Sequence, residues 1–555
     1  MSKKQVFKAY HQHQLMLLPP NLEELIPGNH LVRIVNRVVD KLDLCLLVSC
    51  YEGGGTSAYH PVMLVKVVIY AYASKIYTAR KIAKALREDI NFMWLSGGNR
   101  PDFRTINNFR SGRLKPLIDR LFGSFLKMLI DEGYVRIEHY CVDGTKMRAA
   151  VGKHSYVWKK NAKRYKESTE EKIRELLHYI EESNKAEDQS YGDKDLEELG
   201  DGKDIDGEEL GRKIQELKET IEERFKETGD TSELRNCRQA IREIEKKHIP
   251  KLAHYTNQLS ILGSRNSYSK TDHDATFYKT KDGRLMPGYN VQLGTENQFI
   301  LNYSIHQNPA DNVHLKSHME RFHRLSGRYP KDIIGDSAYG NEENYAFIKE
   351  QGIGNYLKYP SFHQEQSRAR TNNPVDRSGF TYDSSRDEYV CPGTRRLIFK
   401  EVRHEATSTG YHQKVRIYEC HDCSGCVFAA QCIKGKGHKR IHINPTLENY
   451  RQEAYENLTS AKGIQYRKQR NVDVEPVFGH MKWNRGFQRF LLRGVPKVNV
   501  EVGLMSFAHN IKKMAAAIHP IAKKSDQKIA SGLKIIKNIF IRIGRLSFLM
   551  PELGF

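Results

Sequence analysis

Two short strand patterns, far apart in the sequence, each end in an aspartate and a glycine-marked turn, and they constrain the fold more than any other feature. The first covers 137–142 and leads into Asp143 and Gly144. The second is the apolar stretch 333–335, followed by Asp336 and a turn. Ligands of α/β sheets gather where the strands end. Both patterns therefore predict strands that carry a carboxylate to a functional edge.

A third acidic residue, Glu475, lies in the run 470–482, which reads as the start of a helix. Two strand-end aspartates and a helical glutamate supply the hard oxygen ligands that suit Mg²⁺. A metal pair about 4 Å apart stabilises the attacking and leaving oxygens of a phosphoryl transfer. Lys482 follows two helical turns later on the same face, where it can contact a phosphate. The pattern alone leaves open the alternative that these acids are ordinary turn and surface residues.

The segments between these residues complete an α/β order. Alternating residues over 288–294 and 299–305 predict strands that pair with the Asp143 strand. A helix is expected over 343–350 and a further strand over 356–360. Apart from its insertions, this order is that of a ribonuclease-H-like α/β core.

The charge of the chain indicates a polyanionic partner. Its 555 residues include 89 Lys or Arg and 67 Asp or Glu, which gives a net charge of +22. Such a surplus favours nucleic acid through counterion release, although ribosomal and membrane-surface proteins share it. No stretch reaches the roughly 18 apolar residues of a membrane span, and the N-terminus shows no apolar signal region. We therefore expect a cytoplasmic, nucleoid-associated protein with no membrane partner.

Residues 1–125 read as helical. The apolar run that begins at Pro61 predicts a buried helix, and Thr78 can cap the basic helix that follows. Short helices with basic faces fit a helix-turn-helix-like module, and a plain bundle with a solvated basic face is the alternative. The candidate DNA contacts here are Arg80, Lys81, Lys84, Arg104 and Arg110.

Residues 157–260 are dominated by Lys, Glu and Arg, with apolar residues at helical spacing. This pattern predicts two or three amphipathic, coiled-coil-like helices joined by a loose acidic linker. We expect them to form a helical insertion that protrudes from the body.

Five of the nine cysteines fall within one region of the chain. Two C-x2-C spacings share Cys423, and such spacing suits a tetrahedral, structural zinc site. Four ligands leave one cysteine spare, either Cys420 or Cys426, with His421 and His438 as replacement ligands. A cluster of free thiols is the alternative. The candidate ligands are Cys391, Cys420, Cys423, Cys426 and Cys432.

Basic and aromatic residues alternate directly after the predicted helical glutamate. Stacking and phosphate contacts by such residues can position a DNA end. The candidate contacts are Lys482, Arg485 and Arg489. We expect both arginines to be exposed, and Phe487 and Phe490 to belong to the core.

Several of these segments together resemble bacterial insertion-sequence transposases of the DDE superfamily. The group is that typified by insertion sequence 1182, which is related to the insertion-sequence-4/5 superfamily. The most specific blocks are EPVFGHMK at 475–482 and RFLLRG at 489–494. Further blocks lie at 76–82, 101–110, 142–146, 271–275, 288–292 and 335–340, so the resemblance covers nearly the whole chain.

The resemblance implies that Asp143, Asp336 and Glu475 are catalytic ligands of Mg²⁺ or Mn²⁺, and that the N-terminal helices help to bind transposon ends. Related DDE transposases carry a Y-x2-R-x3-E-x6-K signature. Glu475 and Lys482 fit its second half, whereas Arg470 and Tyr466 stand one or more positions out of place.

The expected activity is that of a DNA transposase. Water would first cut at the transposon end, and the freed 3′-OH would then attack target DNA. Double-stranded DNA and further copies of the chain are the expected partners, because two ends have to be held together. The alternatives are a catalytically inactive, sequence-specific DNA-binding protein derived from a transposase, and a nuclease of the same fold that cannot join strands.

The expected fold class is an α/β ribonuclease-H-like catalytic core with an all-helical N-terminal domain, a helical insertion and a β-rich, cysteine-containing insertion. The expected domains are 1–125, helical and DNA-binding; 126–156, the first part of the core; 157–260, the charged helical insertion; 261–360, the core continued; 361–450, the cysteine-rich insertion; 451–515, the final core helices with Glu475; and 516–555, a basic tail.

Overall fold

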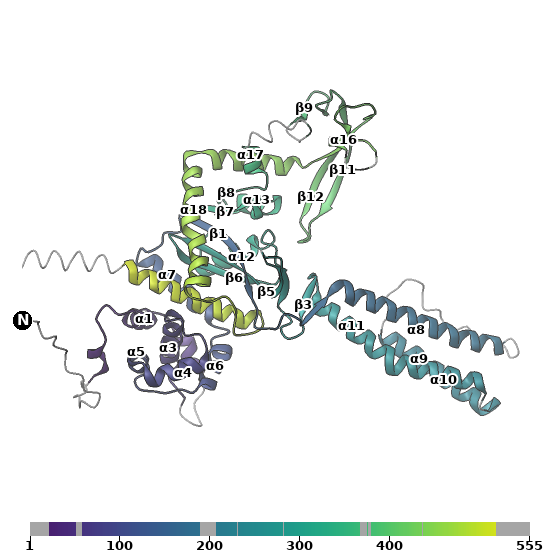
Figure 1. Cartoon of the computed structure of the whole chain (residues 1–555), viewed down its shortest axis with the longest axis horizontal. Helices are drawn as coiled ribbons and strands as arrows, with labels where there is room; N and C mark the ends of the chain where they lie inside the picture. The colour runs from purple at the N-terminus through teal and green to yellow at the C-terminus, as the bar shows by residue number, and fades with distance from the viewer. Residues whose placement is uncertain are drawn as a thin grey trace, which may run out of the picture.

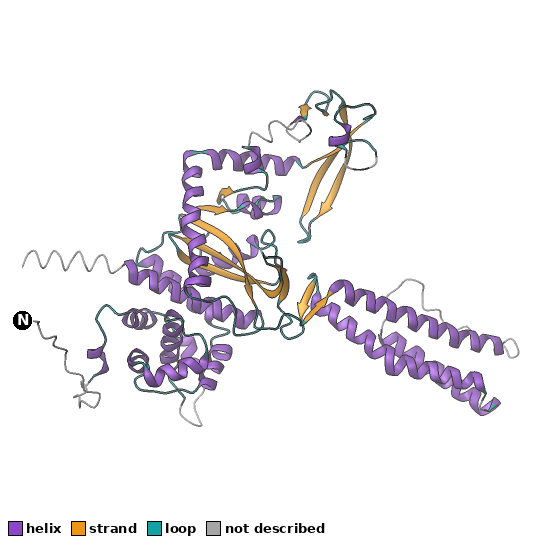
Figure 2. Ribbon diagram, in the orientation of Figure 1, coloured by secondary structure: helices purple, strands orange, loops and turns teal. Residues whose placement is uncertain are grey.

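The computed structural model describes residues 21–51, 58–188, 207–229, 231–280, 282–366, 375, 379–433, 435 and 437–517. A helical N-terminal region, a mixed α/β core, a long helical arm and a second, smaller sheet are distinct in it (Figures 1 and 2). The predicted basic tail lies almost entirely outside the described residues. Among the helices that are described, none combines the length and apolar character needed to cross a membrane.

The N-terminal region packs short helices around α3 (Pro61–Ala73), which is buried on nearly all sides, as its uniformly apolar sequence predicted. Thr78 caps the basic helix α4 (Ala79–Glu88) by accepting a hydrogen bond from the Lys81 N–H at 3.3 Å, which confirms the predicted helix start. The other helices are η1 (Leu22–Leu25), α1 (Leu31–Asp40), α2 (Cys45–Ser49), α5 (Ile90–Leu95), α6 (Phe103–Asn108), η2 (Phe109–Arg113) and α7 (Ile118–Asp131).

The core sheet has six strands in the order β4-β5-β1-β7-β8, with β6 also paired to β5. β1 is antiparallel to β5 and parallel to β7, and β7 is parallel to β8. The predicted pairing of the Asp143 strand with the hairpin that follows the arm is therefore confirmed. The strands are β1 (His139–Arg148), β4 (Thr276–Lys279), β5 (Leu285–Glu296), β6 (Phe299–His306), β7 (Asp332–Gly335) and β8 (Gly354–Leu357).

Helices cover the core sheet. α18 (Ala461–Gly479) contacts β1, β5 and β7, and Figure 1 shows it lying across the sheet. The helix 495–517 is largely buried against the core, and its Asn510 bonds both backbone groups of Ile300 at 2.8 Å. The remaining core helices are α12 (Leu315–Ser326), η4 (Ser337–Tyr339), α13 (Glu342–Glu350), α14 (Phe362–Glu365) and α17 (Pro445–Thr459).

The arm extends away from the sheet and has a hydrophobic core of its own (Figure 1). Ile173, Ile214 and Ile244 are among the buried residues that join its helices, which confirms the predicted amphipathic pattern. The predicted acidic linker between the first two helices falls outside the described residues. The arm contains β2 (Tyr156–Trp158), α8 (Lys159–Asp188), α9 (Gly207–Thr228), α10 (Ser232–Glu243), η3 (Ile244–His248), α11 (Ile249–Leu262) and β3 (Ser267–Ser269).

The cysteines lie in a second, five-stranded antiparallel sheet with the order β13-β12-β11-β10-β9. Its long β11–β12 hairpin reaches back to α13, where Tyr411 Oη donates to Glu342 Oε1 at 3.2 Å. The chain then leads from β13 directly into α17 and α18. The elements are β9 (Thr381–Asp383), β10 (Glu388–Val390), β11 (Arg396–Ala406), β12 (His412–Cys420), α16 (Ala429–Cys432) and β13 (Arg440–Ile443).

Candidate active site

Asp143 lies on β1, and Asp336 directly follows β7, which is the parallel neighbour of β1. The paired residues of these strands run to Cys141 with Ile334, two positions before the two aspartates. The prediction that Asp143 ends its strand is wrong, because β1 continues through Gly144 to Arg148 in its pairing with β5. Asp143 accepts a hydrogen bond from the Gly144 N–H at 2.8 Å, and Asp336 accepts one from the Ala338 N–H at 3.0 Å.

Arg470 connects Asp143 with the third predicted acid. Its Nη2 lies 3.2 Å from Asp143 Oδ2 and its Nη1 lies 3.1 Å from Glu475 Oε1. The Arg470 side chain is buried, whereas half of the Glu475 side chain is exposed. Although Arg470 does not fit the signature spacing, its long side chain reaches both carboxylates. One guanidinium group therefore spans two of the three acids.

Glu475 lies near the end of α18, so the prediction that it begins a helix is wrong. Pro476 sits inside the helix, and because proline has no N–H, the Val472 carbonyl lacks its helical donor. The Gln298 side chain donates to that carbonyl at 2.7 Å instead. Asp473 accepts the backbone N–H groups of residues 297 and 298 at 2.8 and 2.7 Å. The β5–β6 turn therefore makes the proline tolerable and fixes α18 against the sheet.

Burial is the main influence on the charge of Asp143. It raises the pKa of Asp143 to about 6, Arg470 opposes this rise, and the neighbouring Asp336 and Asp311 add to it. Like charges in a desolvated site disfavour the ionised form. The Arg470 guanidinium therefore compensates Asp143 only in part, and an additional cation would favour its ionised form.

Asp311 is a fourth carboxylate at this site, and the sequence analysis missed it. It accepts hydrogen bonds from Asn290 at 2.7 Å and Gln292 at 2.8 Å, and it forms an ion pair with Lys146 at 2.7 Å. A Cβ added at Gly144 would lie 2.4 Å from Asp311 Oδ1, so only glycine lets this carboxylate approach β1 so closely. The available signal was the pair of polar residues on the otherwise apolar strand β5.

The donor set fits a hard divalent cation, since all of its candidate ligands are carboxylate oxygens. In the part of the chain that the structure describes, no three His, Cys, Asp or Glu side chains converge closely enough to hold a metal ion as they stand. Arg470 is the cation that Asp143 and Glu475 contact here. A divalent ion would have to share these oxygens with the guanidinium or displace it.

A basic groove of about 910 Å³ begins beside Asp143, at Gly144 and Thr145. Lys482 reaches it from the π-helix η6 (His480–Asn484), where its Nζ donates to Thr145 Oγ1 and, at 3.0 Å, to the Lys146 carbonyl. Trp483 also lines the groove and is 75% exposed. The other basic side chains along it are Lys146, Arg148, Lys153, Lys279 and Arg284, and the acidic Asp282 lines it as well.

The prediction that Arg485 is exposed and contacts DNA is wrong. Arg485 is buried, and its Nη2 donates to the Tyr72 carbonyl in the interface between α3 and the core. Arg489 is exposed, as predicted, but its guanidinium donates to the carbonyls of Ala149 and Val151 at 3.1 and 3.2 Å. Phe487 and Phe490 are both core residues, as the sequence predicted.

Most of the predicted basic contacts of the N-terminal region are exposed. Arg80, Lys81, Lys84 and Arg104 lie on the surface of α4 and α6, where Arg80 and Arg104 stack on the ring of Phe103. Arg110 is the exception. It is buried, and it donates to the Tyr72 hydroxyl at 3.1 Å and to the Tyr77 carbonyl at 2.7 Å. A DNA contact by Arg110 is therefore ruled out in this arrangement, because packing between helices consumes its donors.

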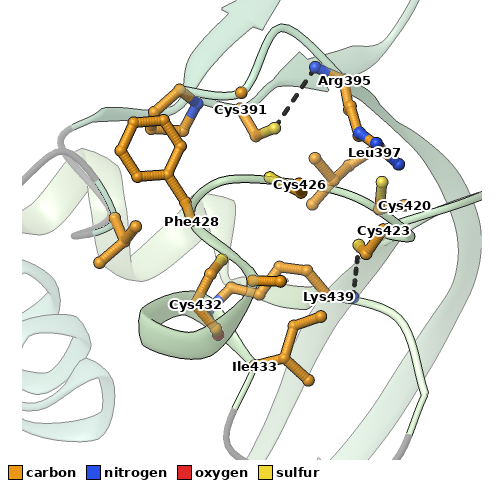
Figure 3. A pocket seen from close by; sticks show the side chains of 14 residues that line it. Cys391, Arg395, Leu397, Cys420, Cys423, Cys426, Phe428, Cys432, Ile433 and Lys439 are labelled. Atoms are coloured by element: carbon orange, nitrogen blue, oxygen red, sulfur yellow. Dashed lines mark hydrogen bonds between the residues drawn. The ribbon is translucent and has the colours of Figure 1, made fainter.

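All five clustered cysteines line one cavity of about 20 Å³ in the second sheet (Figure 3). The five thiols are free. Neither His421 nor His438 lines this cavity. The predicted candidate ligands are therefore brought together, whereas the two predicted replacements are not.

Two stretches of the chain match known protein families. Residues 390–515 match the model described as "Transposase DDE domain", and residues 20–112 match the model described as "Transposase domain (DUF772)". Both are models of transposase domains. The first includes β11, β12 and β13 of the cysteine-containing sheet and α18 with Glu475, and the second includes the helices α1 to α6.

A helical N-terminal region followed by a mixed α/β sheet fits a transposase with a DDE domain. The comparison with curated proteins gave no match.

Proposed function

We propose that the chain is a DNA transposase that cuts at the ends of an insertion sequence and joins the freed 3′ end to target DNA. Its group would be that typified by insertion sequence 1182. The proposal rests on one observation: Arg470 joins Asp143 to Glu475, beside the strand that leads into Asp336. Water is the nucleophile for cutting and the 3′-OH is the nucleophile for joining, so no covalent enzyme intermediate is needed.

A ribonuclease-H-like core accounts for the strand order. The long strand β1 is central, the antiparallel hairpin β5–β6 lies on one side, and the parallel strands β7 and β8 lie on the other. The helical arm then interrupts the core between β1 and β4. The cysteine-containing sheet interrupts it between β8 and α17.

Asp143, Asp336 and Glu475 would hold Mg²⁺ or Mn²⁺. Such a metal pair, when bound, neutralises charge on the attacking and leaving oxygens. Lys482, anchored on the β1 backbone, holds an ammonium group beside the carboxylates for the phosphate at the reacting position. The Arg470 guanidinium, which contacts Asp143 and Glu475, adds a second, planar donor.

The basic groove would hold the DNA that leads into the site. Its cationic side chains suit the phosphate backbone, and the exposed indole of Trp483 offers a stacking surface for an unpaired base. The exposed basic side chains of α4 and α6 would contact the same DNA farther from the cleavage site. Because two transposon ends have to be cut and joined together, the working form would be a homo-oligomer on DNA.

Cleavage of a supercoiled plasmid that carries both ends of the native element tests the proposal. Purified full-length chain should nick it with Mg²⁺ and leave it intact with EDTA. Asp336→Asn should reduce the rate about 10³-fold, with end binding in a mobility-shift assay unchanged within about twofold. Asp131→Asn, an exposed change at the end of α7, is the matched control. Cleavage in EDTA, or full activity of Asp336→Asn, would overturn the proposal.

A further inference from the structure

The second sheet has too small a hydrophobic core to be stable through burial alone. Its core cluster contains six buried residues for five strands, namely Phe380, Leu397, Tyr418, Cys420, Ile441 and Ile443. In β11 only Leu397 is buried, and most of the strand is exposed on both faces. Small units of this kind usually depend on disulfides or a structural metal. The cysteines of this sheet are free thiols, so disulfides do not provide the missing stabilisation.

We propose that this sheet binds one structural Zn²⁺ through Cys391, Cys423, Cys426 and Cys432, and that Cys420 is not a ligand. The four residues come from the β10–β11 turn, the loop after β12 and the end of α16. They surround the small cavity from different sides (Figure 3). The cavity volume of about 20 Å³ is that of a site for a single water-sized sphere.

Two of the four sulfurs accept hydrogen bonds from backbone N–H groups. The Arg395 N–H donates to Cys391 Sγ at 3.4 Å, and the Lys439 N–H donates to Cys423 Sγ at 3.4 Å. A sulfur that accepts N–H bonds is stabilised as the thiolate, which is the form that binds zinc. Gly393 leaves room for a third sulfur, because an added Cβ there would lie 3.0 Å from Cys426 Sγ and 3.7 Å from Cys391 Sγ.

Cys420 differs from the other four. It is the last residue of β12, is 2% exposed, and pairs with Leu397 across the sheet. Its Sγ donates a hydrogen bond to the Asp422 carbonyl at 3.2 Å and also contacts Cys423. Cys420 is thus part of a regular strand, whereas the other four cysteines lie outside the strands. Cys420 therefore belongs to the hydrophobic core of the sheet.

The charges around the cavity suit a metal tetrathiolate. Four thiolates and Zn²⁺ together carry a net charge of about −2. Arg395 and Lys439 both line the cavity, and they supply two positive charges. Arg395 also donates to the carbonyls of Asp422 and Ser424, and Lys439 Nζ donates to the Cys432 carbonyl at 3.2 Å. These contacts hold both cations beside the loops that carry the sulfurs.

The sulfurs surround the cavity without meeting at a common point, since no described group of three such side chains is close enough to hold a metal as it stands. Zinc binding would draw the loops of Cys391, Cys423 and Cys426 inward to Zn–S distances of about 2.3 Å. The ion would thereby fix the base of the β11–β12 hairpin. The tip of this hairpin contacts Glu342 and Glu343 at the start of α13, which follows Asp336.

The zinc content of the full-length chain, purified under reducing conditions and measured by elemental analysis, tests the proposal. One zinc per chain is expected. Cys391→Ser, Cys423→Ser, Cys426→Ser and Cys432→Ser should each lose it. Cys420→Ala should retain it, as should Cys45→Ser, the control at an exposed cysteine of α2. Absence of zinc, or its loss from Cys420→Ala, would overturn the proposal.

Zinc K-edge X-ray absorption keeps the test decisive if a ligand variant fails to fold. The wild-type chain and Cys420→Ala should both show four sulfur neighbours at about 2.3 Å. Fewer than four sulfurs in either protein would contradict the assigned ligand set. Both measurements are independent of DNA cleavage, so the transposase proposal and the zinc proposal can fail separately.

Discussion

The two sheets of this protein are stabilised in opposite ways. In the core sheet, ten consecutive residues of β5 are buried, including polar residues that serve the carboxylate cluster. In the cysteine-containing sheet, β11 is almost as long but has a single buried residue, Leu397. The core sheet is therefore a packed scaffold that can hold a charged site in place. The second sheet has little to pack, and the proposed zinc site would supply the stabilisation that its small core lacks.

This difference explains where each kind of chemistry is located. Crowded carboxylates destabilise their surroundings, so they need a large apolar core to hold them together. Zinc thiolates contribute to folding directly, so they suit a region with almost no core. Substitutions that affect one sheet and spare the other test this difference.

The largest difference is expected from Glu475→Gln, which changes chemistry without changing either sheet. Because half of the Glu475 side chain is exposed, the substitution should leave the melting temperature within about 2 °C of the wild-type value. Plasmid cleavage should fall about 10³-fold. Cleavage assays and thermal melts of the same preparation check both. Unfolding of the variant would mean that Glu475 is a structural residue.

Adding a methyl group at a glycine should destabilise the closely packed core more than the region of the cysteine-containing sheet. At Gly144 an added Cβ would lie 2.2 Å from Gln292 Nε2 and 2.4 Å from Asp311 Oδ1, whereas at Gly435 it would meet no atom within 4 Å. Gly144→Ala should lower the free energy of unfolding of the core by about 1–3 kcal/mol. Gly435→Ala should change it by less than about 0.5 kcal/mol. Urea titration compares them, and equal effects would contradict the packing difference.

The stability of the core should depend on pH through Asp143. Its pKa is raised from 3.8 to about 6, so between these values the folded chain binds the proton more tightly than the unfolded chain. Without divalent metal, the free energy of unfolding should therefore fall as pH rises from about 4 to about 6.

Asp143→Asn removes the free-energy cost of ionising the buried Asp143 carboxyl group. The variant should be more stable than the wild type by about 1–3 kcal/mol at pH 7 without divalent metal, although inactive. Denaturation at pH 4 and pH 7 measures the difference. An identical pH dependence in both proteins would mean that Asp143 is ionised without cost in the fold.

The smallest effect is expected on the surface of the groove. Trp483 is exposed, so Trp483→Ala should leave both sheets intact while weakening the binding of single-stranded or unpaired DNA ends about tenfold. Its neighbour on the chain, Asn484, is also exposed, and Asn484→Ala is the control. Fluorescence anisotropy measures the affinities. Unchanged binding by Trp483→Ala would remove the stacking role.

The sequence predicted those parts of the site that depend on local pattern. The pattern placed Asp336 correctly, directly after β7. It placed Asp143 at the end of a strand rather than within it, because pairing with β5 carries β1 on through Gly144 to Arg148. The sequence also predicted the buried helix α3 and the strands that pair with β1. The presence of a carboxylate on α18 was predicted too, but the position of Glu475 within the helix was not, because proline normally marks a helix start.

The contacts that were missed depend on partners distant in sequence. Arg470 belongs to the site because its side chain reaches Asp143 on β1. Asp311 belongs to it because its carboxylate accepts a hydrogen bond from Asn290 on β5. Arg110 and Arg485 look like surface bases in sequence. Both are buried because oxygens of Tyr72, its hydroxyl and its carbonyl, accept their hydrogen bonds. No local pattern distinguishes such arginines from those that remain on the surface.

The central claim is that three carboxylates on β1, after β7 and on α18 form one cation site. A crystal of the full-length chain soaked in Mn²⁺ tests it most directly through anomalous scattering. The account predicts Mn²⁺ bound within about 2.5 Å of carboxylate oxygens of Asp143 and Asp336, with Glu475 released from Arg470 to complete the site. A map without Mn²⁺ between these aspartates, with Arg470 still bridging Asp143 and Glu475, would contradict it.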